Sequence, residues 1–257
     1  MFVPRLVAFD LDDTLAPSKS PITPRMAELL AELAARVDVA IISGGRLAQF
    51  MMQVVDCLPH LTPQLRSQFH LLPTCGAQYY RLAPDGVETI YARTLDAAQK
   101  AHAMAVTEAE ARRLDLWEGD TGWGEIIEDR GSQITFSALG QDAPVDAKAA
   151  WDPSGAKKNA LRAAVADRLP GLEVRSGGST SVDITEHGID KAYGMTQLAE
   201  QTGIPLDAML FVGDRLDADG NDYPVLAMGV RCQAVTGWQD TAQWLETFIP
   251  ELPLRIR

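Results

Sequence analysis

The feature that most constrains this chain is a short apolar run that ends directly in aspartates. Residues Leu6–Phe9 are followed by the acidic turn Asp10-Leu11-Asp12-Asp13-Thr14-Leu15. A short continuous hydrophobic run predicts a buried parallel strand, and open α/β sheets bind ligands at the carboxyl ends of their strands. We therefore expect Asp10 and Asp12 at a ligand site, where one carboxylate can face a metal and an electrophile while the other faces a leaving group.

A calcium-binding loop is the simplest alternative for this acidic turn. That loop requires the pattern Asp-x-[Asp/Asn]-x-[Asp/Asn]-Gly. Thr14 stands at its fifth place and Leu15 at its sixth, so the pattern fails. The later acidic run 217–222 also fails, because it lacks glycine at the sixth place.

Composition bounds the function further. The 257 residues are 46% hydrophobic and 23% charged, as in an ordinary soluble globular protein, and the formal net charge is −12. Such an acidic chain repels nucleic acid and anionic membranes, so we expect no nucleic-acid or membrane partner. A phosphorylated substrate remains compatible with this charge if a divalent cation and a few basic side chains reverse the local sign.

The cysteines and the apolar segments predict the redox state and the location of the protein. Cys57, Cys75 and Cys232 are scattered and form no CxxC pair, which is typical of reduced thiols and argues against a zinc site. No apolar run approaches the roughly 18 residues that a membrane span needs, and the first aspartate comes too early for a signal peptide. A cytoplasmic location is therefore the expectation.

The two ends of the chain follow a strand–helix–strand rhythm. The first end predicts a helix that begins at Thr23-Pro24, a strand at 37–42 and a helix through 47–54. The second end predicts a helix at 191–201, a strand at 208–212, a helix at 222–228, a strand at 230–235 and a final helix near Trp238. This rhythm is that of an α/β fold with a doubly wound parallel sheet, a Rossmann-like core.

The middle of the chain has a different pattern. Pro84-Asp85-Gly86 predicts a hairpin turn, and another hairpin is expected around Ser176-Gly177-Gly178. Helices are expected at 95–114 and 156–169, with strands at 124–128 and 133–138. Hairpins with two helices indicate an inserted α+β cap domain. We predict a core at 1–81 and 187–257 and a cap at 82–186.

Three further polar groups follow predicted core elements. Ser43 and Gly44 follow a strand, where a hydroxyl and backbone N–H groups can hold a phosphoryl oxygen. Lys191 begins a helix, a position the helix dipole disfavours for a cation, which suggests that it neutralises a carboxylate and phosphoryl oxygens. Asp214 follows a strand and is placed to share a hard cation with Asp10, with a carbonyl, expected to be that of Asp12, and waters as further ligands.

Taken in order, these motifs resemble those of the haloacid-dehalogenase superfamily, mostly magnesium-dependent phosphatases that work through an aspartyl-phosphate. The resemblance implies that Asp10 is the nucleophile, that Asp12 is the general acid and base, and that Mg²⁺ is the cofactor. It assigns Ser43 and Lys191 to catalysis and Asp10, Asp12 and Asp214 to the metal. The fourth motif also contains the supporting residues Asn221 and Asp222.

The predicted cap resembles that of eukaryotic phosphomannomutases and of the type IIB (Cof-like) branch, which also includes sugar-phosphate phosphatases. Arg130-Gly131 with Ser137–Gln141, the run Gly177–Asp183 and Gly188–Lys191 are similar to runs of that family. The resemblance implies that a small phosphorylated metabolite, such as a sugar phosphate, is the substrate. It further allows a homodimer formed through the caps. The substrate-binding residues expected on this basis are Lys19, Gly44, Arg130, Gln141, Ser181 and Asp183.

One departure from the mutase pattern concerns the second cap arginine, which is Gln141 here. A mutase must hold a second phosphate, and a charge-assisted hydrogen bond is worth about 1.5–3 kcal/mol, roughly 10- to 150-fold in affinity. Simple hydrolysis needs no such contact. The sequence therefore favours a phosphoric monoester hydrolase, with a phosphomannomutase-like mutase as the alternative. A receiver-like phospho-acceptor or a non-catalytic binding module is a minor alternative, since receivers are about half this length and lack a cap.

Overall fold

The computed structural model describes residues 2–119 and 122–255. The helices are α1 (Pro24–Ala34), α2 (Leu47–Gln53), α3 (Pro63–Arg66), α4 (Ala97–Arg113), α5 (Val145–Trp151), α6 (Ala156–Arg168), α7 (Lys191–Thr202), α8 (Tyr223–Ala227) and α9 (Trp238–Phe248). The strands are β1 (Leu6–Phe9), β2 (Asp38–Ile42), β3 (Phe69–Leu72), β4 (Gln78–Ala83), β5 (Gly86–Ala92), β6 (Ile127–Asp129), β7 (Gln133–Ser137), β8 (Glu173–Ser176), β9 (Ser181–Thr185), β10 (Met209–Gly213) and β11 (Arg231–Ala234).

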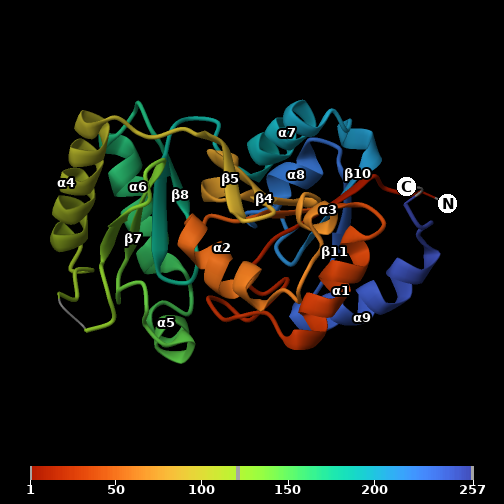
Figure 1. Cartoon of the computed structure of the whole chain (residues 1–257). Coiled ribbons are helices and arrows are strands. Elements are labelled where there is room, and N and C mark those ends of the chain that lie inside the picture. Colours follow the sequence, from red (N-terminus) through yellow and green to blue (C-terminus); the bar gives the residue numbers. More distant parts are fainter. Residues whose placement is uncertain (1, 120–121, 256–257) are drawn as a thin grey trace. The chain divides into compact units, whose positions relative to one another are not determined.

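The chain forms two compact units. One contains Met1–Ala92 and Asp190–Arg257, and the other contains Arg93–Ile189. We call them the core and the cap. The core has a seven-stranded sheet in the order β11-β10-β1-β2-β3-β4-β5, and the cap has a four-stranded sheet in the order β6-β7-β9-β8 (Figure 1).

The core sheet is parallel from β11 to β3, as a doubly wound fold requires. Alternate residues of β1 face opposite layers, because side chains of a strand point to opposite faces. Val7 and Phe9 pack in the cluster that contains the apolar faces of α1 and α9. Leu6 and Ala8 pack in the cluster that contains α7 and α8. Helices therefore cover both faces of the sheet, and the expected α/β doubly wound core is confirmed.

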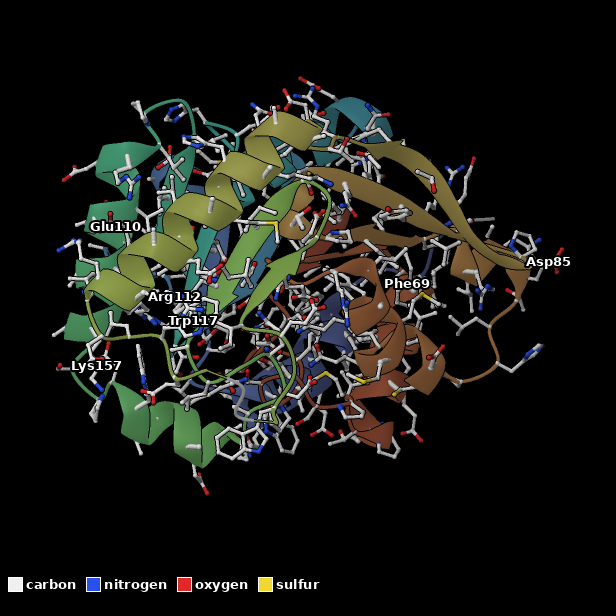
Figure 2. The ribbon with its side chains drawn as sticks, turned by 90° about the vertical axis from the view of Figure 1, so that its left-hand side faces the viewer. Phe69, Asp85, Glu110, Arg112, Trp117 and Lys157 are labelled. Carbon is white, nitrogen blue, oxygen red and sulfur yellow. The ribbon has the colours of Figure 1, made fainter. Side chains whose placement is uncertain are left out.

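The first boundary between core and cap lies later than we expected. The sequence places it after residue 81, inside the first hairpin, whereas the structure places it after Ala92. The β4–β5 hairpin pairs antiparallel with β3 and extends the core sheet, with Asp85 at its turn (Figure 2). An antiparallel hairpin does not by itself identify the unit to which it belongs, because either sheet edge can accept it. The second boundary lies after Ile189 instead of 186.

Strand β3 is a core element that the sequence analysis does not predict. It covers Phe69–Leu72 and pairs in parallel with β2, and all four of its residues are buried. Its four residues include His70 and follow the polar stretch Ser67-Gln68, so the apolar run is too short to stand out. Its position next to β2 brings Leu72 beside the end of that strand, where the backbone N–H of Ser43 donates to the carbonyl of Leu72 at 3.4 Å.

The cap is an antiparallel sheet with helices on one face. Ile134, Phe136, Val174, Val182 and Ile184 pack against apolar residues of α4 and α6. These helices lie together on one side of the cap sheet (Figure 1). The alternate residues of the same strands are polar and point to the other face.

An ion-pair network links the two cap helices. Glu110 of α4 accepts hydrogen bonds from Arg113 at 2.7 Å and from Arg168 of α6 at 2.8 Å. Next to it, the guanidinium of Arg112 lies over the ring of Trp117, which packs beside Phe136 (Figure 2). The ion pairs of Glu110 therefore join α4 to α6.

Within the described residues, no helix has the length and the apolar character needed to cross a bilayer.

Candidate active site

The centre of the candidate site is the pair formed by Asp10 and Lys191. Asp10 directly follows β1, and its backbone N–H donates to the carbonyl of Val212 in the neighbouring strand at 3.0 Å. Lys191 is the first residue of α7, whose N-cap Asp190 accepts from the Tyr193 N–H. The Lys191 Nζ lies 2.6 Å from Asp10 Oδ1. Residues far apart in the chain are thus brought together as the sequence analysis expects.

Asp222 completes this ion-pair cluster. Its Oδ1 accepts a second 2.6 Å hydrogen bond from Lys191 Nζ, and the side chains of both residues are fully buried. Burial by itself lowers the pKa of Lys191, but the carboxylates of Asp10 and Asp222 outweigh it and raise this pKa well above its usual value. Burial raises the pKa of Asp10, and the charge of Lys191 opposes that shift. The lysine therefore stays cationic in the position that the helix dipole disfavours.

The acidic cluster has a donor set that suits a hard divalent cation. Asp10, Asp214 and Asp222 each offer one carboxylate oxygen, and these oxygens lie within 4.8 Å of one another. The negative charge of three carboxylates exceeds the single positive charge of Lys191. Burial and the nearby charge of Asp222 accordingly raise the pKa of Asp214. Mg²⁺ prefers oxygen ligands and is usually held by one or two protein carboxylates. Asp10 and Asp214 can supply these, because both oxygens of Asp222 already accept hydrogen bonds.

The loop after β10 holds Asp222 in place. Asp222 Oδ2 accepts from the backbone N–H of Arg215 at 3.1 Å. A Cβ on Gly213 would lie 2.4 Å from the same oxygen, so this close approach requires glycine. Asn221, expected as a supporting residue, is exposed. The structure thus gives Asp222 a more central position than the sequence analysis assigns to it.

Asp12 lies in a different set of hydrogen bonds from Asp10. Its Oδ1 accepts from the Lys19 N–H at 2.7 Å and from Gln53 Nε2 at 3.2 Å, and its Oδ2 accepts from Gln49 Nε2 at 3.3 Å. Lys19 has the positive backbone angle φ 55°. The Asp12 carboxylate is not in the acidic cluster found among the described residues. Its expected backbone contact with a metal stays a prediction.

Ser43 and Gly44 follow β2, the strand next to β1. Ser43 is buried, and its Oγ accepts from the Gly45 N–H at 3.3 Å. Its carbonyl accepts from the Cys75 N–H at 2.9 Å, which ties this turn to the segment after β3. The turn therefore lies at the carboxyl edge of the sheet that also carries Asp10.

In the cap, Arg130 and Gln141 are brought together with an acid. Arg130 Nε lies 2.7 Å from Glu128 Oε2, and Arg130 Nη2 donates to Gln141 Oε1 at 3.1 Å. The side chains of Arg130 and Glu128 are only 8% and 7% exposed. The charge of this arginine is therefore balanced by a buried carboxylate.

Ser181 and Asp183 are alternate residues of β9, so their side chains share the polar face of the cap sheet. Asp183 Oδ1 accepts from Thr135 Oγ1 at 2.8 Å. A Cβ on Gly177 would lie 2.7 Å from Asp183 Oδ2, so glycine gives this carboxylate its space. Among the expected cap residues, Arg130 is thus hydrogen-bonded to Gln141, and Asp183 lies on the same polar face as Ser181.

The sequence analysis misses several residues that contact these side chains, among them Gln49 and Thr135 described above. Thr14 Oγ1 donates to Asp214 Oδ1 at 3.0 Å, Gln53 donates to Asp12, and Glu128 pairs with Arg130. A sequence signal exists for Gln53, because its place three residues after Phe50 puts a polar side chain on the apolar face of the helix predicted through 47–54. Nothing local marks Glu128, since its partner depends on the turn between β6 and β7.

Comparison with known proteins gives relatives over nearly the whole chain. Residues 26–250 match the family described as eukaryotic phosphomannomutase. A probable phosphomannomutase of Caenorhabditis elegans is 26% identical over 260 residues, which covers 96% of both chains. The Saccharomyces cerevisiae phosphomannomutase is 26% identical and covers 86% of this chain and 84% of its own.

Solved structures share the fold at lower identity. An N-terminally truncated Plasmodium falciparum IMP-nucleotidase has a TM-score of 0.73 at 14% identity, covering 98% of this chain and 71% of its own. A haloacid dehalogenase-like hydrolase from Bacteroides thetaiotaomicron has a TM-score of 0.61 at 17% identity, covering 95% and 99%. The chain shares its fold with this haloacid dehalogenase-like hydrolase and belongs to the eukaryotic phosphomannomutase family.

Proposed function

We propose that the protein is a Mg²⁺-dependent phosphotransferase of sugar phosphates that works as a phosphomannomutase-type mutase through an aspartyl-phosphate on Asp10. The observation that carries the proposal is the 2.6 Å contact of Lys191 Nζ with Asp10, within a cluster of three carboxylates. The family match over residues 26–250 supports mutase chemistry over the hydrolysis that the sequence alone favours.

The metal would be held by Asp10 and Asp214, with Asp222 next to them. Bound there, Mg²⁺ supplies positive charge that offsets the carboxylates and polarises the phosphoryl group. Lys191 contributes a fixed cation at the attacking oxygen of Asp10, because its ammonium is buried and held from two sides. A buried, preorganised charge of this kind stabilises the negative charge of the transferring phosphoryl group.

The proposed reaction has two steps. In the first, an oxygen of Asp10 bonds to phosphorus, the bond from phosphorus to the sugar oxygen breaks, and Asp12 gives that oxygen its proton. In the second, a sugar hydroxyl gives its proton to Asp12, attacks phosphorus and releases Asp10. The hydrogen bonds from Gln49, Gln53 and the Lys19 N–H orient Asp12 for both transfers.

A phosphatase is the second candidate, and Gln141 favours it. With water as the acceptor in the second step, the same residues release inorganic phosphate. Gln141 offers no charge for a second phosphate, and Arg130 beside it is already balanced by Glu128. The two candidates therefore differ in the acceptor and share Asp10, Asp12 and Lys191.

Phosphorus NMR of the reaction with mannose 1-phosphate distinguishes them. With Mg²⁺ and a trace of hexose 1,6-bisphosphate, the mutase forms mannose 6-phosphate and the phosphatase forms inorganic phosphate. Asp10→Asn should abolish either product, and Asp13→Asn is the matched control. Asp13 is exposed at φ 62°, a conformation that asparagine tolerates, so this variant should react normally. Turnover by Asp10→Asn, or undiminished turnover in excess chelator, would contradict the proposal.

A further inference from the structure

A row of polar residues crosses the cap sheet on the face away from its helices. Glu128 of β6 is the register partner of Thr135 in β7, Thr135 is the partner of Asp183 in β9, and Asp183 is the partner of Arg175 in β8. Register partners in antiparallel strands point to the same face. The four residues therefore form one line, which we call the cross-strand row.

The row begins with Glu128 on β6, has Thr135 and Asp183 in its middle, and ends with Arg175 on β8. Thr135 Oγ1 donates to Asp183 Oδ1, and Arg130 binds Glu128 at one end. Arg175 is at the other end, about three strand spacings or roughly 14 Å from Glu128. The helix side of β8 carries Val174, which packs in the cap's apolar cluster, so its neighbour Arg175 belongs to the polar face.

The two arginines are held differently. Arg130 and Glu128 are both buried and lie 2.7 Å apart, so this pair is costly to break. Arg175 is 39% exposed, and its Nε lies at the longer distance of 3.5 Å from Glu173 Oε1. The other Glu173 oxygen is shared with His187 Nδ1 at 3.2 Å. An exposed ion pair contributes little, so loss of the Glu173 contact costs Arg175 little.

We propose that Arg175 is the phosphate-binding residue of the cap and takes the role for which Gln141 lacks a charge. A guanidinium can bind two phosphate oxygens at once, which an amide cannot. The neighbouring Asp183, Thr135 and Ser181 offer acceptors and hydroxyls for the sugar. The inference rests on the proposed function, because it takes a sugar phosphate as the ligand, and it adds the residue that recognises its anionic group.

The test is binding of mannose 6-phosphate and of hexose 1,6-bisphosphate to the Asp10→Asn protein, measured by calorimetry with Mg²⁺. We expect Arg175→Gln to raise the Kd by about 10- to 100-fold, the range of one charge-assisted contact. Arg175→Lys should recover part of the affinity, because it keeps the charge and loses the two-point geometry. Partial recovery would not follow from a purely structural role. The matched control is Arg112→Gln, an exposed cap arginine on the helix side, which should bind normally.

The outcomes separate this inference from the proposed function. If Arg175→Gln binds both ligands as tightly as its Asp10→Asn parent, Arg175 is not the phosphate ligand and this inference fails alone. If the parent binds no sugar phosphate and the wild-type enzyme turns none over, the proposed function fails and the inference falls with it.

Discussion

Lys191 Nζ lies 2.6 Å from Asp222 Oδ1 and 2.6 Å from Asp10 Oδ1, so the ammonium is held between two buried carboxylates from different parts of the chain. Asp222 in turn is fixed through Oδ2 by the Arg215 N–H. Each of its oxygens therefore faces a donor. This arrangement makes Asp222 the anchor of the Lys191 side chain.

Asp222→Asn should lower the free energy of unfolding of the protein. One end of the asparagine amide must place an NH₂ group against either Lys191 or the Arg215 N–H, since both are donors. We expect a loss of about 3–5 kcal/mol in the free energy of unfolding, as for other broken buried ion pairs. Urea unfolding measures it. Asp217→Asn, an exposed acid of the same loop paired with Arg215, is the control and should change stability by about 0.5 kcal/mol or less.

Asp12→Ala should affect substrates according to their leaving group. A sugar alkoxide needs a proton to leave, whereas nitrophenolate hardly does. The rate of the first transfer should therefore fall by about 10²–10⁴-fold with a sugar phosphate and much less with nitrophenyl phosphate. Single-turnover rates with both substrates measure this. An equal loss on the two would show that Asp12 is not the general acid.

Gln53→Leu should reproduce part of the Asp12 defect. The buried Gln53 amide donates to Asp12 Oδ1 at 3.2 Å and to the Ser20 carbonyl at 2.8 Å, so it links the acid to the loop after β1. Leucine retains the volume and loses both bonds. We expect a fall of about tenfold in kcat with sugar phosphates, for a lost bond to a charged group. Gln49→Leu, which removes the longer 3.3 Å contact, should cost less; the reverse order would contradict this assignment.

Acidification should destabilise the core through His70. Its Nδ1 lies 2.7 Å from the Tyr79 hydroxyl, and burial, aided by Arg81, lowers the pKa of His70 to about 4. The unfolded chain, with an ordinary histidine pKa near 6.5, binds the proton first. The contribution of His70 to the free energy of unfolding is therefore fully present above about pH 6.5. It is lost as the pH decreases toward 4, by about 3 kcal/mol in total. Unfolding midpoints between pH 7 and 4 measure the slope.

His70→Gln should flatten this slope, because glutamine does not titrate. His187 provides a control of opposite sign. Bonds to the Pro170 carbonyl and to Glu173 raise its pKa, so its contribution is present at low pH and disappears as the pH rises. A His187→Gln variant should therefore keep the acid loss of the wild type. An unchanged slope in His70→Gln would show that another group is responsible.

Gly177→Ala should weaken substrate binding through Asp183. The added methyl group would lie 2.7 Å from Asp183 Oδ2, so the carboxylate must move away from its position beside Thr135. We expect KM for the sugar phosphate to rise by about two- to tenfold, the effect of one lost hydrogen bond. Gly178→Ala is the neighbouring control, since a Cβ there meets nothing within 4 Å. Equal KM values in the two variants would exclude Asp183 from substrate binding.

The sequence by itself determined the parts of the site that follow from local pattern. Leu6–Phe9 is apolar on both faces, so it forms a strand buried in a parallel sheet, and the chain must leave that strand at Asp10. The same reasoning places Ser43 after β2 and Asp214 after β10. Strand ends are encoded where hydrophobic residues give way to polar ones, and this signal is local.

The tertiary structure decided the pairings. Lys191 forms an ion pair with Asp222 as well as with Asp10, and Gln53 donates a hydrogen bond to Asp12. Arg175 is the register partner of Asp183. Each pairing depends on the packing of a helix or on the register of two strands, which a one-residue slip would change completely. The place of the β4–β5 hairpin in the core sheet is decided in the same way, because its pairing with β3 is a property of the sheet edge and not of its own sequence.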